Sequence, residues 1–385
     1  MSQSQEEQFF WAAYYGDLEN IKSLCSDPAL DINWQDGGGF TPLSGACEKG
    51  HIGVVECLLS LKGIDPAKQS KKGSTPFFMA CGKGHKEVVS LLLADPRIDP
   101  VKPNHNGAPP FNIACQQGNQ EVVSLLLSDP RIDPNQLKND DATPLFMACQ
   151  NGHKEVVSLL LSDPRIDPHK QKNDEATPFF VASQNGHQEV VFYMLADPRI
   201  DPNKPRIDQT TPLWHASQNG HLVVVQHLLA SGREIDTRRR SSFNTKTAAE
   251  QGRVMGERIT KPADETEEVF QGKKKSCAPC ADLIDEYEHD PVAVRRRLRR
   301  QPGLREYFIG HLFALVVFYS DSFVVMNEKL AHPDTRRFFR ITSRLPLEIQ
   351  MIICNRIFGS PRDIVLSRDS EPGFKLLTRT TTWQQ

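Results

Sequence analysis

Short apolar runs and short polar segments alternate along the first 235 residues, and the pattern repeats every 34 residues. Each copy opens with a proline, runs through small and apolar residues to a Gly-His or Gly-Asn step, and ends in apolar pairs such as Val88-Val89 and Leu92-Leu93. Proline suits the first position of a helix, and glycine suits the left-handed residue that ends one. The pattern therefore predicts two short helices in each copy. The opening prolines are Pro42, Pro76, Pro110, Pro144, Pro178 and Pro212.

The residue before each opening proline supports this prediction. Threonine takes this place in five copies, and its side-chain oxygen is a good acceptor for the first helical turn. Pro109 takes it before Pro110, so we expect a weaker start for that helix. The apolar stripe of the second helix is too large for one helix pair to bury. Neighbouring copies must therefore stack, which predicts an all-α solenoid.

These copies resemble ankyrin repeats, which combine a Thr-Pro-Leu-His-x-Ala-Ala step with Gly-His and a Val-x-x-Leu-Leu helix. The resemblance covers about residues 8–252 and implies an ankyrin-repeat α-solenoid with β-hairpin tips, which binds protein and has no catalytic activity. The period is 34 residues here, against ~33 in the family. The family's usual histidine is replaced by Ser44, Phe78, Asn112, Phe146, Phe180 and Trp214.

The pattern divides the chain into three parts. Residues 1–252 hold the array of about seven repeats, beginning with an atypical copy at 8–35 and ending with a helix at 244–252 that we expect to act as a cap. Residues 253–280 are mostly polar, and their few large apolar side chains follow no period, which predicts a flexible linker.

Residues 281–385 return to helical patterning and predict a small α-helical C-terminal domain, with Asp290-Pro291 at one helix start. A segment of this domain is similar to the start of an F-box, a helical module that docks substrate receptors onto a ubiquitin ligase. This resemblance implies an adaptor whose array selects the substrate; the alternative is a helical cap. The residues that carry the likeness are Leu345, Pro346, Glu348, Ile349 and Ile352.

Ankyrin proteins hold their partners on the solvent side of the first helices and at the loop tips. The resemblance therefore implies a protein-binding surface at the residues just before each turn glycine and at Lys71 and Lys72. Tyr14 and Tyr15 are the best anchor candidates, because aromatic side chains dominate interface energetics. Gln-Asn recurs in three copies, which favours duplicated scaffold over a finely tuned groove. The helix positions are Tyr14, Tyr15, Glu48, Lys49, Lys83, Gln116, Gln117, Gln150, Asn151, Gln184, Asn185, Gln218 and Asn219.

The sequence contains no Gly-rich phosphate loop, no paired histidines on a helix and no nucleophile elbow. In five of the six copies a histidine occupies the same turn, with Asn119 in its place in the remaining copy. We expect these histidines to hydrogen-bond to neighbouring loops rather than to bind metal. Cys277 and Cys280 form a lone Cys-x-x-Cys, for which zinc would need two further ligands; only His289 is near. We therefore predict no enzyme, metal site, cofactor or small-molecule substrate.

Charge is distributed unevenly along the chain. Residues 1–235 carry 20 Lys and Arg against 28 Asp and Glu, whereas residues 236–385 carry 26 against 20. An acidic array repels nucleic acid, so the expected partner is a protein of unknown identity. The basic segments at 273–275 and 295–300 leave a nuclear import or nucleic-acid patch open, but a solvated helix face or a surface docking on the array is favoured.

Four cysteines share one repeat position, which is typical of a small buried residue. Stacked helices lie ~8–10 Å apart, beyond the ~7 Å limit for a disulfide, so reduced thiols in the cytoplasm or nucleus are expected. Cys25 and Cys57 look like core positions too. No signal peptide is apparent, polar residues interrupt the apolar stretch at 308–326, and we expect a monomer without membrane contact. The four cysteines are Cys47, Cys81, Cys115 and Cys149.

Overall fold

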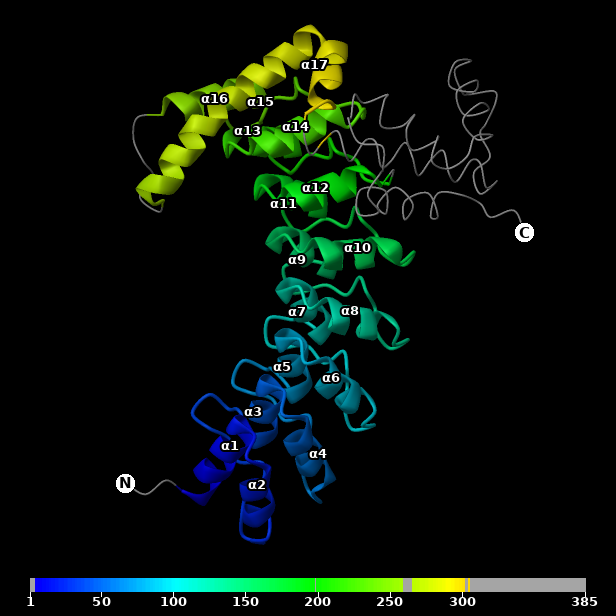
Figure 1. The fold of residues 1–385 in the computed structure, drawn as a ribbon, viewed down its shortest axis with the longest axis vertical. Helices are drawn as coiled ribbons and strands as arrows, with labels where there is room; N and C mark the ends of the chain where they lie inside the picture. Colours follow the sequence, from blue (N-terminus) through cyan, green and yellow to red (C-terminus); the bar gives the residue numbers. More distant parts are fainter. Residues whose placement is uncertain (1–3, 198, 259–264, 302–303, 305–385) are drawn as a thin grey trace, which may run out of the picture. The chain divides into compact units, whose positions relative to one another are not determined.

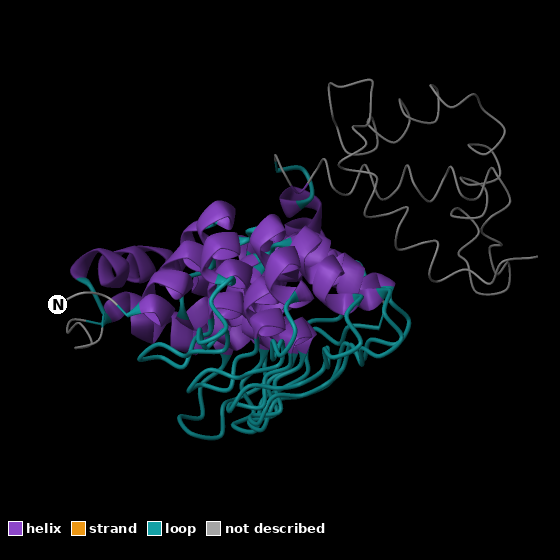
Figure 2. Ribbon diagram, turned by 90° about the horizontal axis from the view of Figure 1, so that it is seen from below, coloured by secondary structure: helices purple, strands orange, loops and turns teal. Residues whose placement is uncertain are grey.

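The computed structural model describes residues 4–197, 199–258, 265–301 and 304 of the 385-residue chain. These residues belong to two compact units, one ending at Val181 and one beginning at Ala182, and the division falls inside a helix. Both units are built from α-helices joined by loops, and the described part of the chain contains no β-strand (Figure 2). The predicted all-α class is confirmed for these residues.

Unit 1 (residues 4–181) contains five stacked helix pairs (Figure 1). The first helices of the pairs form one layer and the second helices form another, and each helix packs on its counterpart in the next pair. The first helices are α1 (Gln5–Tyr15), α3 (Pro42–Lys49), α5 (Pro76–Lys83), α7 (Pro110–Gln117) and α9 (Pro144–Asn151). The second helices are α2 (Leu18–Leu24), α4 (Ile52–Ser60), α6 (Lys86–Leu93), α8 (Gln120–Leu127) and α10 (Lys154–Ser162).

The threonine before each opening proline caps its helix, as predicted. The Thr41 hydroxyl accepts a hydrogen bond from the Ser44 backbone N–H at 3.1 Å. Pro109 offers no such acceptor, yet α7 has the same eight-residue length as α5. Packing between repeats therefore sets the helix bounds, and the cap adds stability to the first turn. The same cap occurs at Thr75, Thr143, Thr177 and Thr211.

The Gly-His step joins each repeat to the one before it. Gly50 ends α3 with a φ of 79°, a left-handed conformation that favours glycine. A Cβ atom at Gly50 would lie 2.6 Å from the His85 ring, so glycine leaves the space into which the next repeat inserts its imidazole. The His85 Nε2 atom lies 2.9 Å from the Glu48 carbonyl oxygen. The predicted histidine hydrogen bonds are confirmed, and they recur at His51, His153 and His221.

The core combines the apolar pairs of the second helices with small residues of the first. Val88, Val89 and Leu92 are at most 1% exposed. The four cysteines of the shared repeat position are fully buried, as predicted, and desolvation raises the pKa of each thiol. Cys25 and Cys57 are only half-buried, so the expectation of core positions was wrong for them. Cys25 follows the last turn of α2, and Cys57 lies within α4 beside its buried residues Val54, Val55 and Leu58.

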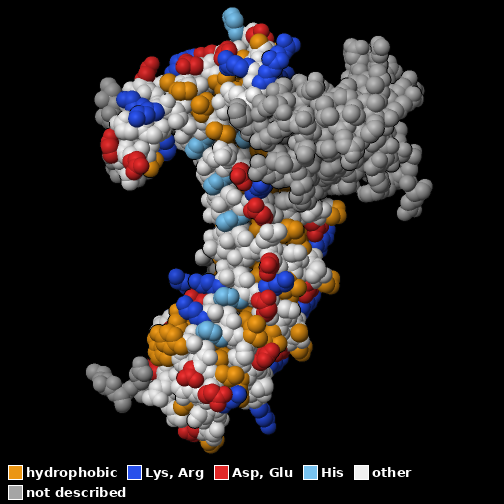
Figure 3. Space-filling view, viewed as in Figure 1, with side chains coloured by type: hydrophobic (Ala, Val, Ile, Leu, Met, Phe, Trp, Pro, Cys, Tyr) orange, Lys and Arg blue, Asp and Glu red, His pale blue; other side chains and the backbone are white. Residues whose placement is uncertain are grey.

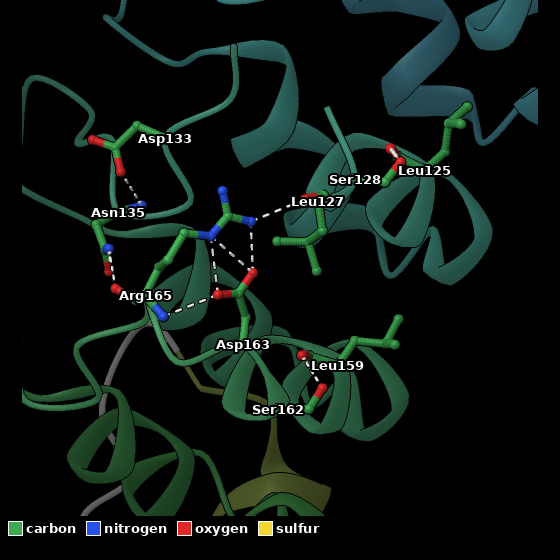
Figure 4. Close-up of polar contacts among 9 residues, drawn as sticks. All are labelled: Leu125, Leu127, Ser128, Asp133, Asn135, Leu159, Ser162, Asp163 and Arg165. Carbon is green, nitrogen blue, oxygen red and sulfur yellow. Dashed lines mark hydrogen bonds and ion pairs between the residues drawn. The ribbon is translucent and has the colours of Figure 1, made fainter. Parts of the chain in front are cut away.

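Each Asp-Pro-Arg connector ties its repeat to the preceding one. Arg165 Nη2 donates to the Asp163 carboxylate at 2.6 Å and to the Leu127 carbonyl oxygen of the preceding repeat at 2.9 Å (Figure 4). The Arg165 guanidinium lowers the pKa of Asp163, since its hydrogen bonds favour the charged carboxylate. We call Arg97, Arg131 and Arg165 the connector arginines, because all three bond to a leucine carbonyl 38 residues earlier.

The loop tips of unit 1 are turns without the β-hairpins that the family resemblance implied. Within one loop, Ser70 N–H donates to Ser74 O at 2.9 Å and Gly73 N–H donates to Ser70 O at 2.8 Å. Neighbouring loops are joined by a single backbone bond, such as that from Lys71 N–H to Gly38 O at 3.0 Å. One such bond between loops is too little for a strand ladder, which needs a series of paired residues.

Unit 2 (residues 182–304) holds further helix pairs and three helices after them. Helices α13 and α14 pack on each other, α15 packs on α13, and α16 packs on α15 and α14. The helix expected at 244–252 is displaced toward the C-terminus: α15 begins at Ala248, after a capping box between Thr247 and Glu250, and ends at Glu257. The helices are α11 (Pro178–Gln184), α12 (Gln188–Leu195), α13 (Pro212–Gln218), α14 (Leu222–Ala230), α15 (Ala248–Glu257), α16 (Glu267–His289) and α17 (Pro291–Leu298).

Helix α16 occupies much of the segment that the sequence predicted to be a flexible linker, and this corrects the prediction at 267–280. Its buried face includes Phe270, Cys277, Cys280 and Ala281. The prediction counted only large apolar side chains, whereas cysteine and alanine supply part of this face. The Cys277 thiol lies 3.2 Å from the Gln218 carbonyl oxygen, which fixes α16 to the end of α13.

Helix α17 begins at Asp290-Pro291 as predicted, with the Asp290 carboxylate accepting from Ala293 N–H at 2.9 Å. Its arginines hold it in place: Arg295 donates to Arg233 O at 3.2 Å and Arg299 donates to Ala230 O at 2.8 Å. The basic segment at 295–300 is thus partly used inside unit 2, which favours the structural interpretation over a nucleic-acid patch. The rest of the α-helical C-terminal domain expected at 281–385, from residue 305 onward, lies outside the described residues.

Candidate functional site

The residues that end the first helices form a row along one side of unit 1. We call this set the helix-end row. In each pair the last residue before the turn glycine is exposed, and the residue before it is half-buried except at Gln150, which is exposed as well. Consecutive members come from helices that pack on each other, so the row is continuous through α1, α3, α5, α7 and α9. Its members are Tyr14, Tyr15, Glu48, Lys49, Lys83, Gln116, Gln117, Gln150 and Asn151.

Aromatic rings cluster at the α1 end of this row. Tyr15 is 72% exposed and Trp11, one turn earlier, is 40% exposed. Their rings stack with centroids 5.7 Å apart, and Tyr14 meets both edge to face. Figure 3 shows hydrophobic side chains gathered over α1. Tyr15 thus fits the predicted anchor better than Tyr14, which is half-buried against Gly45.

Trp11 belongs to this cluster but was not among the sequence-predicted residues. It precedes Tyr15 by four positions, and residues four apart share a helix face. That spacing could have revealed it once the helix bounds were known. The exposed rings of Trp11 and Tyr15 therefore leave a large apolar surface at the α1 end of the row.

Positive charge lies next to the aromatic cluster. The Lys49 ammonium lies 4.5 Å from the centroid of the Tyr14 ring, and the pKa of Lys49 is raised by its hydrogen bond to Tyr14. Further along, Lys83 forms a 3.3 Å ion pair with Glu48. The row therefore changes from aromatic to basic and then, from α7 onward, to uncharged amides.

In unit 2 the corresponding residues are less accessible. Asn185 is exposed, whereas Gln218 and Asn219 at the end of α13 are half-buried. Helix α16 lies against this end of α13. The Gln218 carbonyl oxygen accepts a hydrogen bond from the Cys277 thiol, and a Cβ added at Gly220 would lie 2.9 Å from the Lys273 carbonyl oxygen. Gln184 serves the fold through its carbonyl oxygen, which accepts from Asn219 and His221.

Lys71 and Lys72, the predicted tip residues, are exposed in the loop between α4 and α5. Their backbones join this loop to its neighbours, because Lys71 N–H donates to Gly38 O and Lys72 O accepts from His105 N–H. The side chains are available to a partner. They belong to the loops, while the helix-end row belongs to the helices.

Two open hollows lie on the second helices. One, of about 450 Å³, lies among α6, α8 and α10, and the other, of about 400 Å³, lies beside α12 and α14. His227 lines the second hollow against Phe192, and burial lowers the pKa of His227 to about 4. Among the described residues, no group of three or more His, Cys, Asp or Glu side chains converges as a metal site would require.

Comparison with family models gives a direct match for the repeats. The model of ankyrin repeats in three copies matches four overlapping segments, residues 9–104, 56–138, 97–172 and 164–241. Together these matches span more than half of the chain. The chain belongs to the ankyrin-repeat family. Ankyrin repeats generally mediate protein–protein interaction and are typically non-catalytic.

The comparisons give no support to the F-box resemblance. Its residues, Leu345, Pro346, Glu348, Ile349 and Ile352, lie outside the described residues, and the family match ends at 241. No curated protein matches the chain. No helix in the described part of this ankyrin protein combines the length and the apolar character that crossing a membrane requires.

Proposed function

We propose that the helix-end row of unit 1 binds a segment of another protein, with Tyr15 and Trp11 as the apolar anchor. The observation that carries this proposal is the exposure of both rings on α1. Tryptophan and tyrosine are enriched among the residues that contribute most to protein interfaces. Their burial by a partner would remove a large apolar surface from water.

The dimensions of the row suit an extended or helical segment. Five first helices stacked at ~8–10 Å give a surface of roughly 40 Å. An extended chain covers this distance with about 12 residues at ~3.3–3.6 Å each. Lys49 and Lys83 favour acidic groups in the part of the segment next to the anchor, and the amides beyond them offer both donors and acceptors.

The test is affinity capture from a eukaryotic lysate, quantified by mass spectrometry and followed by calorimetry with the purified partner. Tyr15→Ser should weaken partner binding at least ten-fold, since loss of an interface anchor costs about 1.4 kcal/mol or more. Lys49→Glu should weaken the same partner. Val292→Ser is the matched control, because Val292 is 65% exposed on α17 and lies outside the row.

Tyr15 and Lys49 are surface residues, so both variants should unfold at the wild-type temperature. A partner that binds Tyr15→Ser and Lys49→Glu as tightly as the wild type would contradict the proposal. A second contradicting result would come from the capture experiment. It would be that the wild-type chain enriches no protein relative to a column carrying the full chain with both Tyr15→Ser and Lys49→Glu.

A further inference from the structure

Two loops of unit 2 lie side by side and are held together by hydrogen bonds. We call residues 204–210 and 236–246 the paired loops. The Ser242 backbone N–H and its hydroxyl both donate to the Asp208 carbonyl oxygen, at 2.9 and 3.0 Å. Arg239 adds a bond of 3.4 Å to the Gln209 side chain. The backbones on either side of Asp208 and Ser242 therefore lie near each other.

Those neighbours are two exposed apolar side chains. Ile207 precedes Asp208, Phe243 follows Ser242, and each is 61% exposed. The Phe243 ring meets the ring of Trp214 edge to face with centroids 5.5 Å apart, while Trp214 itself is 1% exposed. The Phe243 ring therefore packs against Trp214 while most of its surface remains exposed to solvent. Because this contact already restricts the ring, little side-chain freedom remains to be lost when a ligand covers it.

The other loops of the array carry polar side chains at the position of Ile207. The residues that lie 34, 68, 102 and 136 positions before Ile207 occupy the same place in the earlier loops. Their side chains are two amides, an imidazole and an ammonium group. An isoleucine at this position therefore sets the loop at 204–210 apart from the other loops. The equivalent residues are Asn173, Asn139, His105 and Lys71.

The paired loops also carry an excess of positive charge. They contain six basic residues and two acidic ones, whereas the equivalent loops at 136–142 and 170–176 contain three basic and four acidic residues. Arg239 and Arg240 form ion pairs with Asp236 and Glu250. Arg238, however, is 81% exposed and reaches Glu288 only at 3.9 Å. Exposed pairs of this kind contribute about 0–1 kcal/mol and can be exchanged for an incoming carboxylate.

We propose that the paired loops form a second interaction surface, which binds an acidic protein segment carrying one large apolar side chain. The apolar side chain packs against Ile207 and Phe243, and flanking carboxylates pair with Arg238 and its neighbours. A nucleic acid would use the charges but would gain nothing from an exposed isoleucine, so the apolar pair favours a protein ligand. This surface is separate from the helix-end row and does not depend on it.

The experiment uses the full chain and a fluorescein-labelled hexapeptide of acidic residues with one central leucine. Fluorescence anisotropy should show binding, and replacement of the leucine by serine in the peptide should weaken it at least five-fold. Ile207→Ser should weaken the leucine peptide by the same factor and leave the serine peptide unchanged, because the two changes remove one contact. Arg238→Ser should weaken both peptides and reduce the salt dependence of binding.

Controls separate binding from folding. Ile207 and Arg238 are exposed, so both variants should keep the wild-type unfolding temperature. Val292→Ser removes a similarly exposed apolar side chain from α17 and should not affect binding of the peptide. Tyr15→Ser should not affect it either, which distinguishes this surface from the helix-end row.

Three outcomes would overturn the proposal. The first is absence of binding at millimolar peptide. The second is equal binding of the leucine and serine peptides, which would indicate attraction by charge alone. The third is a 20-nucleotide single-stranded DNA that displaces the peptide and binds more tightly, with an affinity that Ile207→Ser leaves unchanged.

Discussion

The imidazole of His85 donates from Nε2 to the backbone carbonyl oxygen of Glu48, 2.9 Å away in the preceding repeat. A carbonyl oxygen can only accept, so the Nε2 atom must carry the proton. The same ring fills the space that Gly50 leaves open. One histidine therefore caps the end of the neighbouring first helix and packs against its turn.

Replacement of this histidine tests how strongly it joins the repeats. His85→Ala should lower the free energy of unfolding by about 1–2 kcal/mol, because a partly buried carbonyl loses its partner and a gap opens beside Gly50. His85→Asn should recover part of the loss, since Asn119 naturally occupies the equivalent place and donates to Cys81 O and Gly82 O at 2.8 and 2.9 Å. Urea unfolding measures both variants.

His105→Ala is the control for that series. His105 is exposed in a loop tip, so its removal should change the unfolding free energy by less than about 0.5 kcal/mol. Equal losses at His85 and His105 would show that the contact with Glu48 contributes little.

Two glycines separate the cost of a left-handed backbone from the cost of the clash. Gly118 has a φ of 76° and lies against the His153 ring, which a Cβ would approach to 2.5 Å. Gly63 has a φ of 90° with nothing within 4 Å of an added Cβ. Gly63→Ala should cost ~1–2 kcal/mol of stability, and Gly118→Ala should cost at least about 2 kcal/mol more. If the two cost the same, the histidine ring can move aside freely.

The repeats could be predicted from the sequence because their signals are local. Thr41, Pro42 and Gly50 act on their own helix, and the 34-residue period shows that each helix meets another copy of itself. Helix α16 was missed because its buried face includes Cys277 and Ala281, which become core residues only when α13 and α15 lie against them. Exposure of Trp11 likewise depends on packing between helices: among the described residues, α3 is the first-layer helix that packs on α1.

The two units should respond differently to acid. Burial lowers the pKa of His215 and His227 in unit 2 to about 4, whereas both would bind protons near pH 6.5 in the unfolded chain. Their contribution to stability is therefore complete above pH 6.5 and is lost as the pH falls toward 4. In unit 1, the connector arginines lower the pKa of Asp95, Asp129 and Asp163. That contribution is lost only below about pH 4.

Hydrogen exchange at pH 7.5 and 5 measures this difference for each unit. Between pH 7.5 and 5, the opening free energy of the amides in α14 should fall by roughly 2 kcal/mol. Each histidine contributes at most about 1.4 kcal/mol per pH unit, and the contribution of His227 is reduced because its side chain is partly exposed. Amides of α6 should keep theirs. His227→Gln should reduce the loss in α14, and an equal loss of protection in α6 and α14 would contradict the assignment to these histidines.

The connector arginines have a mechanical consequence. Each one reaches back to the preceding repeat and no further, so a load applied to the ends of unit 1 is carried by a series of separate neighbour contacts. Detachment of one repeat releases 34 residues, or roughly 120 Å of chain at ~3.5 Å per residue. Under tension, unit 1 should therefore lengthen in steps of equal size, with each remaining repeat still folded on the next.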